Sequence, residues 1–471
     1  MNARILGLET EYGCLIHKDN SKESPEGISW RLKEMILKKQ KLGVVDLHFR
    51  AHDEPAGNGG FLLNGGRVYL DMGHLEYASP ECLGLADLVA YDRAGDLLLQ
   101  TAVEEAGLSG AVSIIKNNID HLTGATFGSH ENYLVPRDFP FTYEGLSLLI
   151  PFLVTRQLFT GAGRVGAHHV PDGWVLLESK TFPNVDFQLS QRSDHIVNDF
   201  YQWVQFNRAI INTRDEPLAD PSRFRRIHLL LGDSNMMEYA TALKMGTTSA
   251  VLSLIEENAV PSGLNLADPV NDLRAISRDL SLKKEILLDN GKKMNALEIQ
   301  NLYLEAAEKR LAGRNDDTDW TLKAWRETLE ALVQAPERLI GKIDWISKKW
   351  LLEMFLESEH KSWQDPWAAS LDLEYHNLNP AQGLSFALEE EGKAFRMTSD
   401  AAIRLSVTSP PRNTRASARG ELARIVLEKQ ASKYLFNWTE VQIEGMPPFE
   451  LEDPYKTYTG PLQAYLANAG W

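Results

Sequence analysis

The most constraining feature of the sequence is a pair of segments in which polar and apolar residues alternate, residues 4–17 and 66–72. Side chains two positions apart in a β-strand lie on the same face, so each segment predicts a strand with one polar face. The polar positions are Glu9 and Glu11 in the first segment, and Arg67, Tyr69 and Asp71 in the second. Such strands suit an antiparallel sheet that packs one face on the core and opens the other to a cleft.

The order of elements along the chain predicts the fold class. Further strands are expected at 112–117 and 129–136, as a pair, and at 182–192 and 226–232. Helices are expected at 28–39 and 86–107, and long helical patterns dominate residues 247–360, including 296–313, 321–334 and 336–360. Strands that precede a block of helices indicate an α+β fold. The linker-like SPPRNTR at 409–415 predicts a boundary between a catalytic domain, 1–405, and a small C-terminal domain, 406–471.

Composition excludes several classes of protein. The 471 residues are 43% hydrophobic and carry a net charge of −16, which disfavours a nucleic-acid partner. Two cysteines cannot form a disulfide framework or a four-cysteine zinc site. The N-terminal MNARILGLETEYG has acids where a signal peptide needs apolar residues, and no apolar run is long enough to span a membrane. We therefore expect a soluble, cytoplasmic protein without a membrane partner.

Carboxylates and histidines share the polar faces of the predicted strands. Glu9 and Glu11 repel each other and need a cation nearby, although an isolated pair of this kind is more often a solvated surface. His74 and Glu76 follow the second strand in an expected turn, and a surface hairpin with incidental charges would explain that segment equally well. His130 shares a strand face with Asn132, and His228 points away from the apolar residues of its own strand. Carboxylates with a few histidines suit magnesium or manganese.

Three other positions are candidates for contacts with a nucleotide. Arg192 in LSQRSDH and Arg214 in INTRDEP could clamp anionic oxygens. Trp438 could be a core aromatic or a flat surface for an adenine ring. No Walker loop is present, and GAGRVG at 161–166 is more typical of a tight turn than of a phosphate loop.

The motifs together resemble a known family. They are GLETEYG, NGGRVYLD, HLEYASPE, KNNID, SHENYL, PFLVTRQLFTGAG, LSQR, INTRDEP, RRIHLLLGDSNM and SPPRNTR, and they extend over nearly the whole chain. This chain resembles the Pup ligase and depupylase family (PafA and Dop) of the glutamine-synthetase-like carboxylate–amine ligases. The resemblance implies a curved antiparallel sheet with helices on its convex face, and a small C-terminal domain that closes over the nucleotide.

The resemblance also implies site residues, cofactors and partners. Asp71 is the implied catalytic residue; the implied metal-site residues are Glu9, Glu11, Tyr69, Glu76, His130 and His228; the implied nucleotide-binding residues are Arg67, Ser79, Arg192, Arg214 and Trp438. The implied cofactors are ATP, or ADP plus phosphate, and Mg²⁺. The implied partners are a Pup-like small protein modifier and its lysine-conjugated protein targets, in a proteasome pathway.

Two activities follow from the resemblance. A ligase would phosphorylate the modifier's C-terminal glutamate, and a target lysine, deprotonated by Asp71, would attack the acyl phosphate. A depupylase would cleave the isopeptide bond and deamidate a terminal glutamine at the same site. Small-molecule carboxylate–amine ligation and a scaffold without turnover are the remaining hypotheses.

The motifs divide between these two activities. The five-residue step from Asp71 to Glu76 and the stretch FTGAGRVG are depupylase-like, whereas FLVTRQL, LSQRSDHI and GDSNM are ligase-like. Leu75 and Leu218 replace the family's usual proline and histidine, which suggests a divergent branch. Because the five-residue step lies in the catalytic loop itself, we favour the depupylase and keep the ligase as the alternative.

Overall fold

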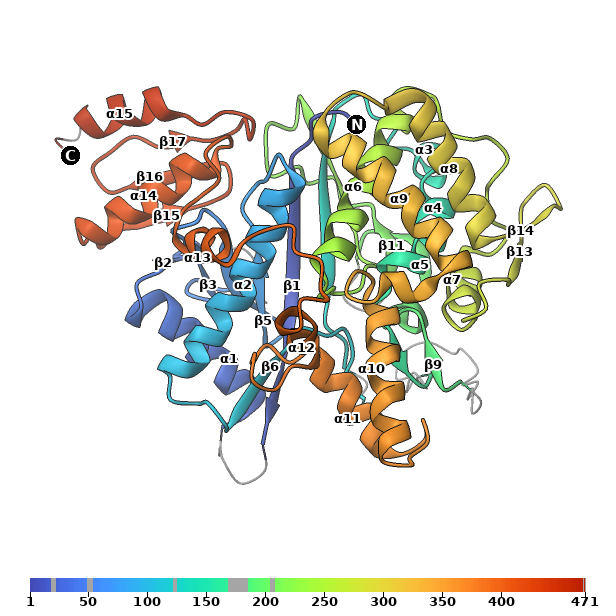
Figure 1. Ribbon diagram of the computed structural model, residues 1–471. Helices are drawn as coiled ribbons and strands as arrows, with labels where there is room; N and C mark the ends of the chain where they lie inside the picture. Colours follow the sequence, from blue (N-terminus) through green and yellow to red (C-terminus); the bar gives the residue numbers. More distant parts are fainter. Residues whose placement is uncertain are drawn as a thin grey trace.

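The computed structural model describes residues 1–17, 23–48, 54–121, 125–167, 185–203, 208–468 and 470. Within them, a ten-stranded sheet forms the centre of the molecule (Figure 1). In sheet order the strands are β10 (Asn198–Tyr201), β11 (Ala209–Asn212), β12 (Phe224–Leu229), β7 (Ser129–Pro136), β1 (Leu6–Ile16), β5 (His74–Ala78), β4 (Arg67–Asp71), β3 (Gly59–Leu62) and β2 (Gly43–Val45), with β6 (Val112–Ile115) on the distal half of β1. The described pairs are antiparallel except β10 with β11, which is parallel.

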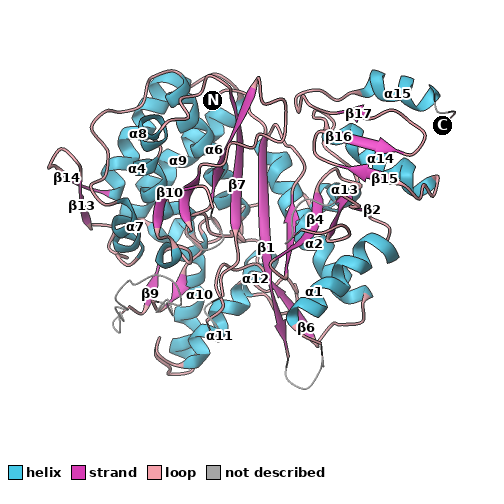
Figure 2. Ribbon diagram, turned by 180° about the vertical axis from the view of Figure 1, so that it is seen from behind, coloured by secondary structure: helices cyan, strands magenta, loops and turns pink. Residues whose placement is uncertain are grey.

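Helices gather on one face of this sheet, and Figure 2 shows the strands from the opposite side. The long helices are α2 (Leu85–Glu105), α6 (Glu238–Glu256), α8 (Ala296–Leu311), α9 (Asp316–Gln334) and α10 (Asp344–Ser358). The shorter ones are α1 (Pro25–Glu34), η1 (Met35–Lys39), α3 (Tyr143–Ser147), α4 (Ile150–Thr155), α5 (Gln157–Thr160), η2 (Ser193–His195), α7 (Pro269–Ser277), η3 (Pro336–Leu339), α11 (Pro366–Tyr375), α12 (Leu384–Glu390) and α13 (Asp400–Thr408). Small ribbons pair β8 (Arg164–Val165) with β9 (Phe187–Gln188), and β13 (Glu285–Leu287) with β14 (Lys293–Asn295).

The alternation along β1 separates the core from the open face. Leu6, Leu8 and Tyr12 are buried in the main hydrophobic cluster, and the Tyr12 hydroxyl donates to Asp96 of α2 at 2.9 Å. Glu9 and Glu11 point to the other face, as strand periodicity requires. The apolar residues therefore fix the register of β1, and the register in turn places both carboxylates outside the core.

The C-terminal segment packs against the β2–β3 edge of the sheet through a second cluster of apolar residues. It contains α14 (Ala416–Glu428), a ribbon of β15 (Tyr434–Phe436), β16 (Glu440–Ile443) and β17 (Phe449–Glu450), and α15 (Thr459–Asn468). Leu422 and Phe436 of this segment share a buried cluster with Val44 and Phe61 of β2 and β3. The boundary at residues 405 and 406 stays a prediction.

The predicted α+β class and the antiparallel character of the sheet are confirmed. Three details of the prediction are wrong. Segments 112–117 and 129–136 do not pair with each other, since β6 and β7 both pair with β1. His74 and Glu76 lie in strand β5 rather than in a turn, because β4 reverses within two residues. Segment 182–192 contains only the two-residue strand β9 among its described residues, and 182–184 lie outside the described part.

A local sequence pattern does not show which strands pair, because partners that are far apart in the sequence are selected by packing of the core. The pattern at 336–360 also divides into η3 and α10, with Gly341 between them at a φ of +78°.

In the described residues, no helix is both long and apolar enough to cross a membrane.

Candidate active site

Strand pairing brings the predicted acids and histidines together on the open face. In the register of the sheet, Glu9 stands opposite His130 on β7, and Glu11 stands opposite Glu76 on β5. Tyr69 on β4 stands opposite Glu76 from the other side. Residues far apart in the sequence thus form one continuous polar row across three strand pairs, and this row contains two groups of metal-ligand type.

The first group consists of Glu9, His130 and His228, whose ligand atoms lie within 4.8 Å of one another. Nδ1 of His130 is 3.2 Å from Oε2 of Glu9, and Nε2 of His228 is 3.7 Å from the same oxygen. Burial alone would raise the pKa of Glu9, but the hydrogen bond with His130 and the charges of both histidines and Arg226 lower it to about 2. Burial lowers the pKa of His228 well below its usual value, and its Nε2 is buried without a hydrogen-bond partner among the described residues. A neutral imidazole with an unused ring nitrogen is a good metal ligand.

The second group consists of Glu11, Asp71 and Glu76, whose carboxylate oxygens also lie within 4.8 Å of one another. Glu76 is almost fully buried; this burial, together with the charges of Glu11, Glu9 and Asp71, raises its pKa well above the usual value. Nδ1 of His74 is 3.4 Å from Glu11, and a hydrogen bond from that ring helps to lower the pKa of Glu11 against the effect of burial. The three carboxylates thus crowd together, and their mutual repulsion acts on the buried Glu76.

Both groups fit hard divalent cations by the chemistry of their donors. Magnesium and manganese take carboxylate oxygens, and manganese also accepts imidazole nitrogen. Tyr69 contributes differently from the acids: burial and Glu76 raise the pKa of its phenol well above the usual value, and its hydroxyl is hydrogen-bonded with Glu76. A protonated phenol in this position orients a carboxylate. The predicted role of Tyr69 at the metal stays a prediction.

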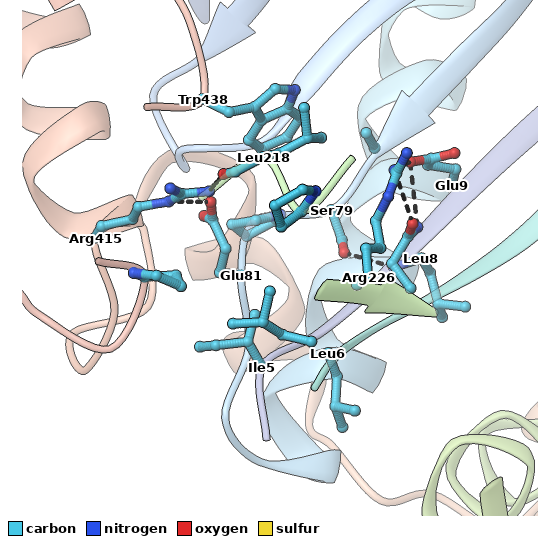
Figure 3. Close-up of a pocket in the computed structure, with 17 residues that line it drawn as sticks. Ile5, Leu6, Leu8, Glu9, Ser79, Glu81, Leu218, Arg226, Arg415 and Trp438 are labelled. Atoms are coloured by element: carbon cyan, nitrogen blue, oxygen red, sulfur yellow. Dashed lines mark hydrogen bonds and ion pairs between the residues drawn. The ribbon is translucent and has the colours of Figure 1, made fainter. Parts of the chain in front are cut away.

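A pocket opens beside the first group (Figure 3). Its walls include Ile5, Leu218, Ser79 and Trp438, and Glu9 lies at its other side with Arg226. One end is therefore apolar and aromatic, and the other end is charged. The pocket thus joins two predicted nucleotide-binding residues, Ser79 and Trp438, to a predicted metal ligand, which suits a ligand with a flat apolar end and an anionic end.

The three arginines predicted to bind the nucleotide lie in different environments. Arg67 is buried, with its guanidinium beside the Tyr69 ring, and its Nη2 pairs with Asp46 at 2.9 Å and with Glu54. Arg192 is also buried, and its guanidinium donates to the carbonyl oxygens of residues 127 and 230. Arg214 is half exposed and forms an ion pair of 2.8 Å with Glu216. Of these three arginines, Arg214 has the most exposed side chain.

Several residues that sequence reasoning did not assign also belong to this site. Asn132 Nδ2 donates to Glu9 at 3.2 Å, and Asn212 Nδ2 lies 3.3 Å from Nδ1 of His228. Arg226 Nη1 lies 3.8 Å from Oε1 of Glu9. Strand alternation could have found Arg226, since it precedes His228 by two positions and therefore shares its face.

A tight turn carries Asp71. The strands β4 and β5 pair up to Asp71 and His74, so that Met72 and Gly73 alone form the turn. Both have positive φ, 45° and 89°, as in the type I′ turns that suit two-residue hairpins. The short step from Asp71 to Glu76 therefore reflects the geometry of the hairpin, which is compatible with more than one reaction at the adjoining site.

Comparison with known proteins identifies the family. The family model described as "Pup-ligase protein" matches residues 4–442. A Pup–protein ligase of Pseudarthrobacter chlorophenolicus is 35% identical over 485 residues, covering 100% of both chains. A Pup–protein ligase of Acidimicrobium ferrooxidans is 36% identical over 466 residues, covering 96% of each.

Two solved structures are similar over almost the whole chain. The complex between Pup and its ligase PafA has a TM-score of 0.85 and 33% identity, and covers 99% of this chain and 91% of that one. The structure of the Pup ligase PafA in complex with ADP has a TM-score of 0.79 and 32% identity, and covers 96% and 94%. These matches confirm the predicted fold and the predicted PafA type of enzyme.

The preference for the depupylase is wrong. The curated relatives reported above are named Pup–protein ligases, and both solved structures are of the ligase PafA. The spacing from Asp71 to Glu76 misled the prediction because it records only the length of a hairpin turn. By the extent of the family match and the identity to full-length relatives, the chain belongs to the Pup-ligase protein family.

Proposed function

We propose that the protein is an ATP- and magnesium-dependent ligase that joins the C-terminal carboxylate of a Pup-like modifier to a lysine of a target protein, in the cytoplasm. The observation that carries this proposal is the apolar pocket of Trp438, whose lining extends to Glu9 of the first metal-ligand group. A nucleotide needs such a pair of environments, because its base is flat and weakly polar whereas its phosphates bind cations. The names of the relatives, Pup–protein ligase and PafA with Pup or with ADP, support the same choice.

Asp71 is the residue best placed to serve as general base. It stands at the tip of the β4–β5 hairpin, half buried, where a lysine side chain could approach from solvent. A protonated lysine is not a nucleophile, so the reaction requires a carboxylate that removes its proton close to the acyl carbon. The fixed turn of Met72 and Gly73 holds Asp71 close to Glu11 and Glu76.

The carboxylates and histidines would hold the metal ions. Glu11 and Glu76 form one candidate set, next to the base Asp71, and Glu9, His130 and His228 form the other. Bound divalent cations would offset the charge of phosphate oxygens during phosphoryl transfer. Asn132 and Asn212 would orient Glu9 and His228 within their set.

Conjugation in a purified system tests the proposal. The protein would be incubated with ATP, magnesium, a Pup-like peptide ending in Gly-Gly-Glu and a lysine-bearing target protein, and mass spectrometry would follow the target. We expect an isopeptide on lysine and release of ADP, both abolished by EDTA. Release of ADP with a free amino acid alone, or cleavage of a preformed conjugate without any conjugate formation, would contradict the proposal.

A further inference from the structure

A buried carboxylate, Glu81, joins the catalytic sheet to the C-terminal segment. It follows shortly after β5 and belongs to the lining of the pocket of Trp438 (Figure 3). Nε of Arg415 lies 2.7 Å from its Oε1, and Nη2 of Arg419 pairs with its Oε2. Both arginines are almost fully buried, and their charges lower the pKa of Glu81 to about 2 against the effect of burial. The three side chains therefore form an ionised triad at the junction of the two segments.

One member of this triad, Arg419, contacts Trp438 in two ways. Its guanidinium carbon lies 4.6 Å from the centroid of the indole ring, which is the geometry of a cation–π contact. Its Nη1 also donates to the backbone carbonyl oxygen of Trp438 at 3.3 Å. The same guanidinium donates to the carbonyl oxygen of Gly65, from Nε at 2.9 Å and from Nη2 at 2.6 Å. A single guanidinium thus couples the indole to the turn between β3 and β4 and to Glu81.

The turn at Gly65 lies directly against α14, the helix that carries Arg419. Gly65 has a φ of +81°, and a Cβ at this position would lie 2.8 Å from the carbonyl oxygen of Ala416. Gly420 approaches the other side of the turn in the same manner, since its Cβ would lie 2.4 Å from the carbonyl oxygen of Leu63. These close approaches hold α14, and with it Arg419, at a fixed distance from the sheet.

The position of Arg419 relative to the pocket separates it from the residues that a ligand would touch. Arg419 is fully buried and is not part of the pocket lining, whereas Arg415 and Trp438 are. A ligand in the pocket would therefore contact the indole and not the guanidinium of Arg419. Any effect of Arg419 on a ligand has to pass through Trp438 or through the backbone around it.

We propose that Arg419 is a positioning residue, which holds the ring of Trp438 in place at the apolar end of the pocket. This inference rests on the proposed function, since it presumes that the base of a nucleotide lies against that ring. A ring that is fixed before the ligand arrives loses less freedom on binding, and this favours affinity. Lysine would keep the charge beside Glu81, but it lacks the planar fork that reaches Gly65, Glu81 and Trp438 together.

A double-mutant cycle tests whether Arg419 acts through Trp438. Isothermal titration with ADP and magnesium would compare the wild type, Arg419→Lys, Trp438→Ala and the double variant. We expect Arg419→Lys to weaken ADP binding about 3- to 10-fold in the wild-type background. In the Trp438→Ala background the same substitution should change ADP binding less than about 1.5-fold, because the ring that it positions is absent.

Arg223→Lys is the matched control for this cycle. Arg223 also connects the sheet region to the C-terminal segment, through an ion pair of 2.8 Å with Asp453, but its side chain is half exposed and lies outside the pocket lining. We expect this variant to bind ADP as the wild type does. In the conjugation assay, Arg419→Lys should raise the KM for ATP and leave the KM for the modifier nearly unchanged, which a general loosening of the fold would not do.

A second substitution guards against misfolding. Arg419→Gln runs through the same cycle, so that the outcome does not depend on one variant, and thermal unfolding without ligand checks that each protein is folded. Equal losses of ADP affinity in both backgrounds, or wild-type affinity in both Arg419 variants, would overturn the positioning role of Arg419. Loss of folding by both variants would likewise overturn it in favour of a purely structural role. Failure of the wild type to bind ADP would instead contradict the proposed function itself.

Discussion

The two metal-ligand groups lie side by side on the same sheet and differ in how their charge is balanced. Glu9 is surrounded by His130, His228 and Arg226, and its pKa is lowered to about 2. Glu76, one strand away, is buried among Glu11 and Asp71, and its pKa is raised well above the usual value. The chain therefore surrounds the carboxylate of Glu9 with cationic and hydrogen-bonding side chains, whereas it buries the carboxyl of Glu76 beside two other carboxylates.

The largest expected effect of breaking this arrangement is at Asp71. Asp71→Asn keeps the size of the side chain but cannot accept a proton from lysine, so we expect conjugation to fall by a factor of about 10² to 10⁴. The conjugation assay measures this change, and an ADP titration should remain within about threefold of the wild type, because the pocket of Trp438 is separate from the hairpin tip.

Asp215→Asn is the matched control for this substitution. Asp215 pairs with Arg137 and Arg225 away from the site, so its removal should leave the conjugation rate nearly unchanged. Conjugation by Asp71→Asn at the rate of the control would refute the role of Asp71 as base.

The contrast between the groups predicts opposite effects on stability without metal. In EDTA at pH 7, Glu76→Gln removes a buried carboxyl whose ionisation its neighbours disfavour, so we expect the free energy of unfolding to rise by about 1–3 kcal/mol. Glu9→Gln instead leaves His130 and Arg226 without their carboxylate, so we expect a fall of about 1–3 kcal/mol. Urea unfolding measures both changes.

Adding manganese sharpens the same comparison. The wild type should gain thermal stability, and Glu76→Gln should lose most of that gain, because a carboxylate ligand has become a neutral amide. If both substitutions change the free energy of unfolding in EDTA by the same amount and in the same direction, the charges of the two groups are balanced alike.

The pH dependence of unfolding should separate the groups further. The lowered pKa of Glu9 means that its contribution to stability is present above the ordinary value of 4.5 and is lost as the pH falls toward 2. The raised pKa of Glu76 means that its contribution is complete below 4.5 and is lost as the pH rises through the folded-state value.

In EDTA, the advantage of Glu76→Gln over the wild type should therefore widen as the pH rises above about 4.5. The disadvantage of Glu9→Gln should shrink below that pH. Urea unfolding as a function of pH checks both trends, and parallel profiles for the three proteins would contradict the assigned charge states.

Strand periodicity predicted the polar face well because alternation depends only on local geometry. It placed Glu9 with Glu11, and His130 with Asn132, on faces that the structure confirms as partly exposed. It could not say which strands are neighbours, so the opposition of Glu11 and Glu76 became visible only from the register. Long-range pairing depends on packing of the core, which a local pattern does not encode.

The environment of each arginine could not be predicted from the sequence, for a related reason. Arg67 and Arg192 are buried and make close contacts with protein oxygens, whereas both ion pairs of Arg226 are 3.8 Å long. All three belong to recognisable motifs, and the difference between them comes from the loops and strands that fold over each side chain. Only three-dimensional contacts can distinguish an arginine that stabilises the fold from one that is available to a ligand.

The smallest expected effect concerns the turn that carries Asp71. Met72 adopts a φ of 45°, a conformation that costs a residue with a Cβ about 1 kcal/mol and that asparagine tolerates much better. Because 60% of Met72 is exposed, its replacement loses little packing. We therefore expect Met72→Asn to raise the free energy of unfolding by about 0.5–1 kcal/mol and to leave conjugation unchanged, since the turn keeps its geometry.

Lys41→Asn provides the control at another non-glycine position, with a φ of 55° and no place in the site. Urea unfolding should show similar gains for the two variants if the strain is purely a backbone property. A gain at Lys41 with a loss at Met72 would instead show that the Met72 side chain stabilises the hairpin, and hence the position of Asp71. The group of Glu11, Asp71 and Glu76 would then depend for its geometry on an exposed side chain as well as on the sheet. The group of Glu9, His130 and His228 lies on three paired strands and needs no such side chain.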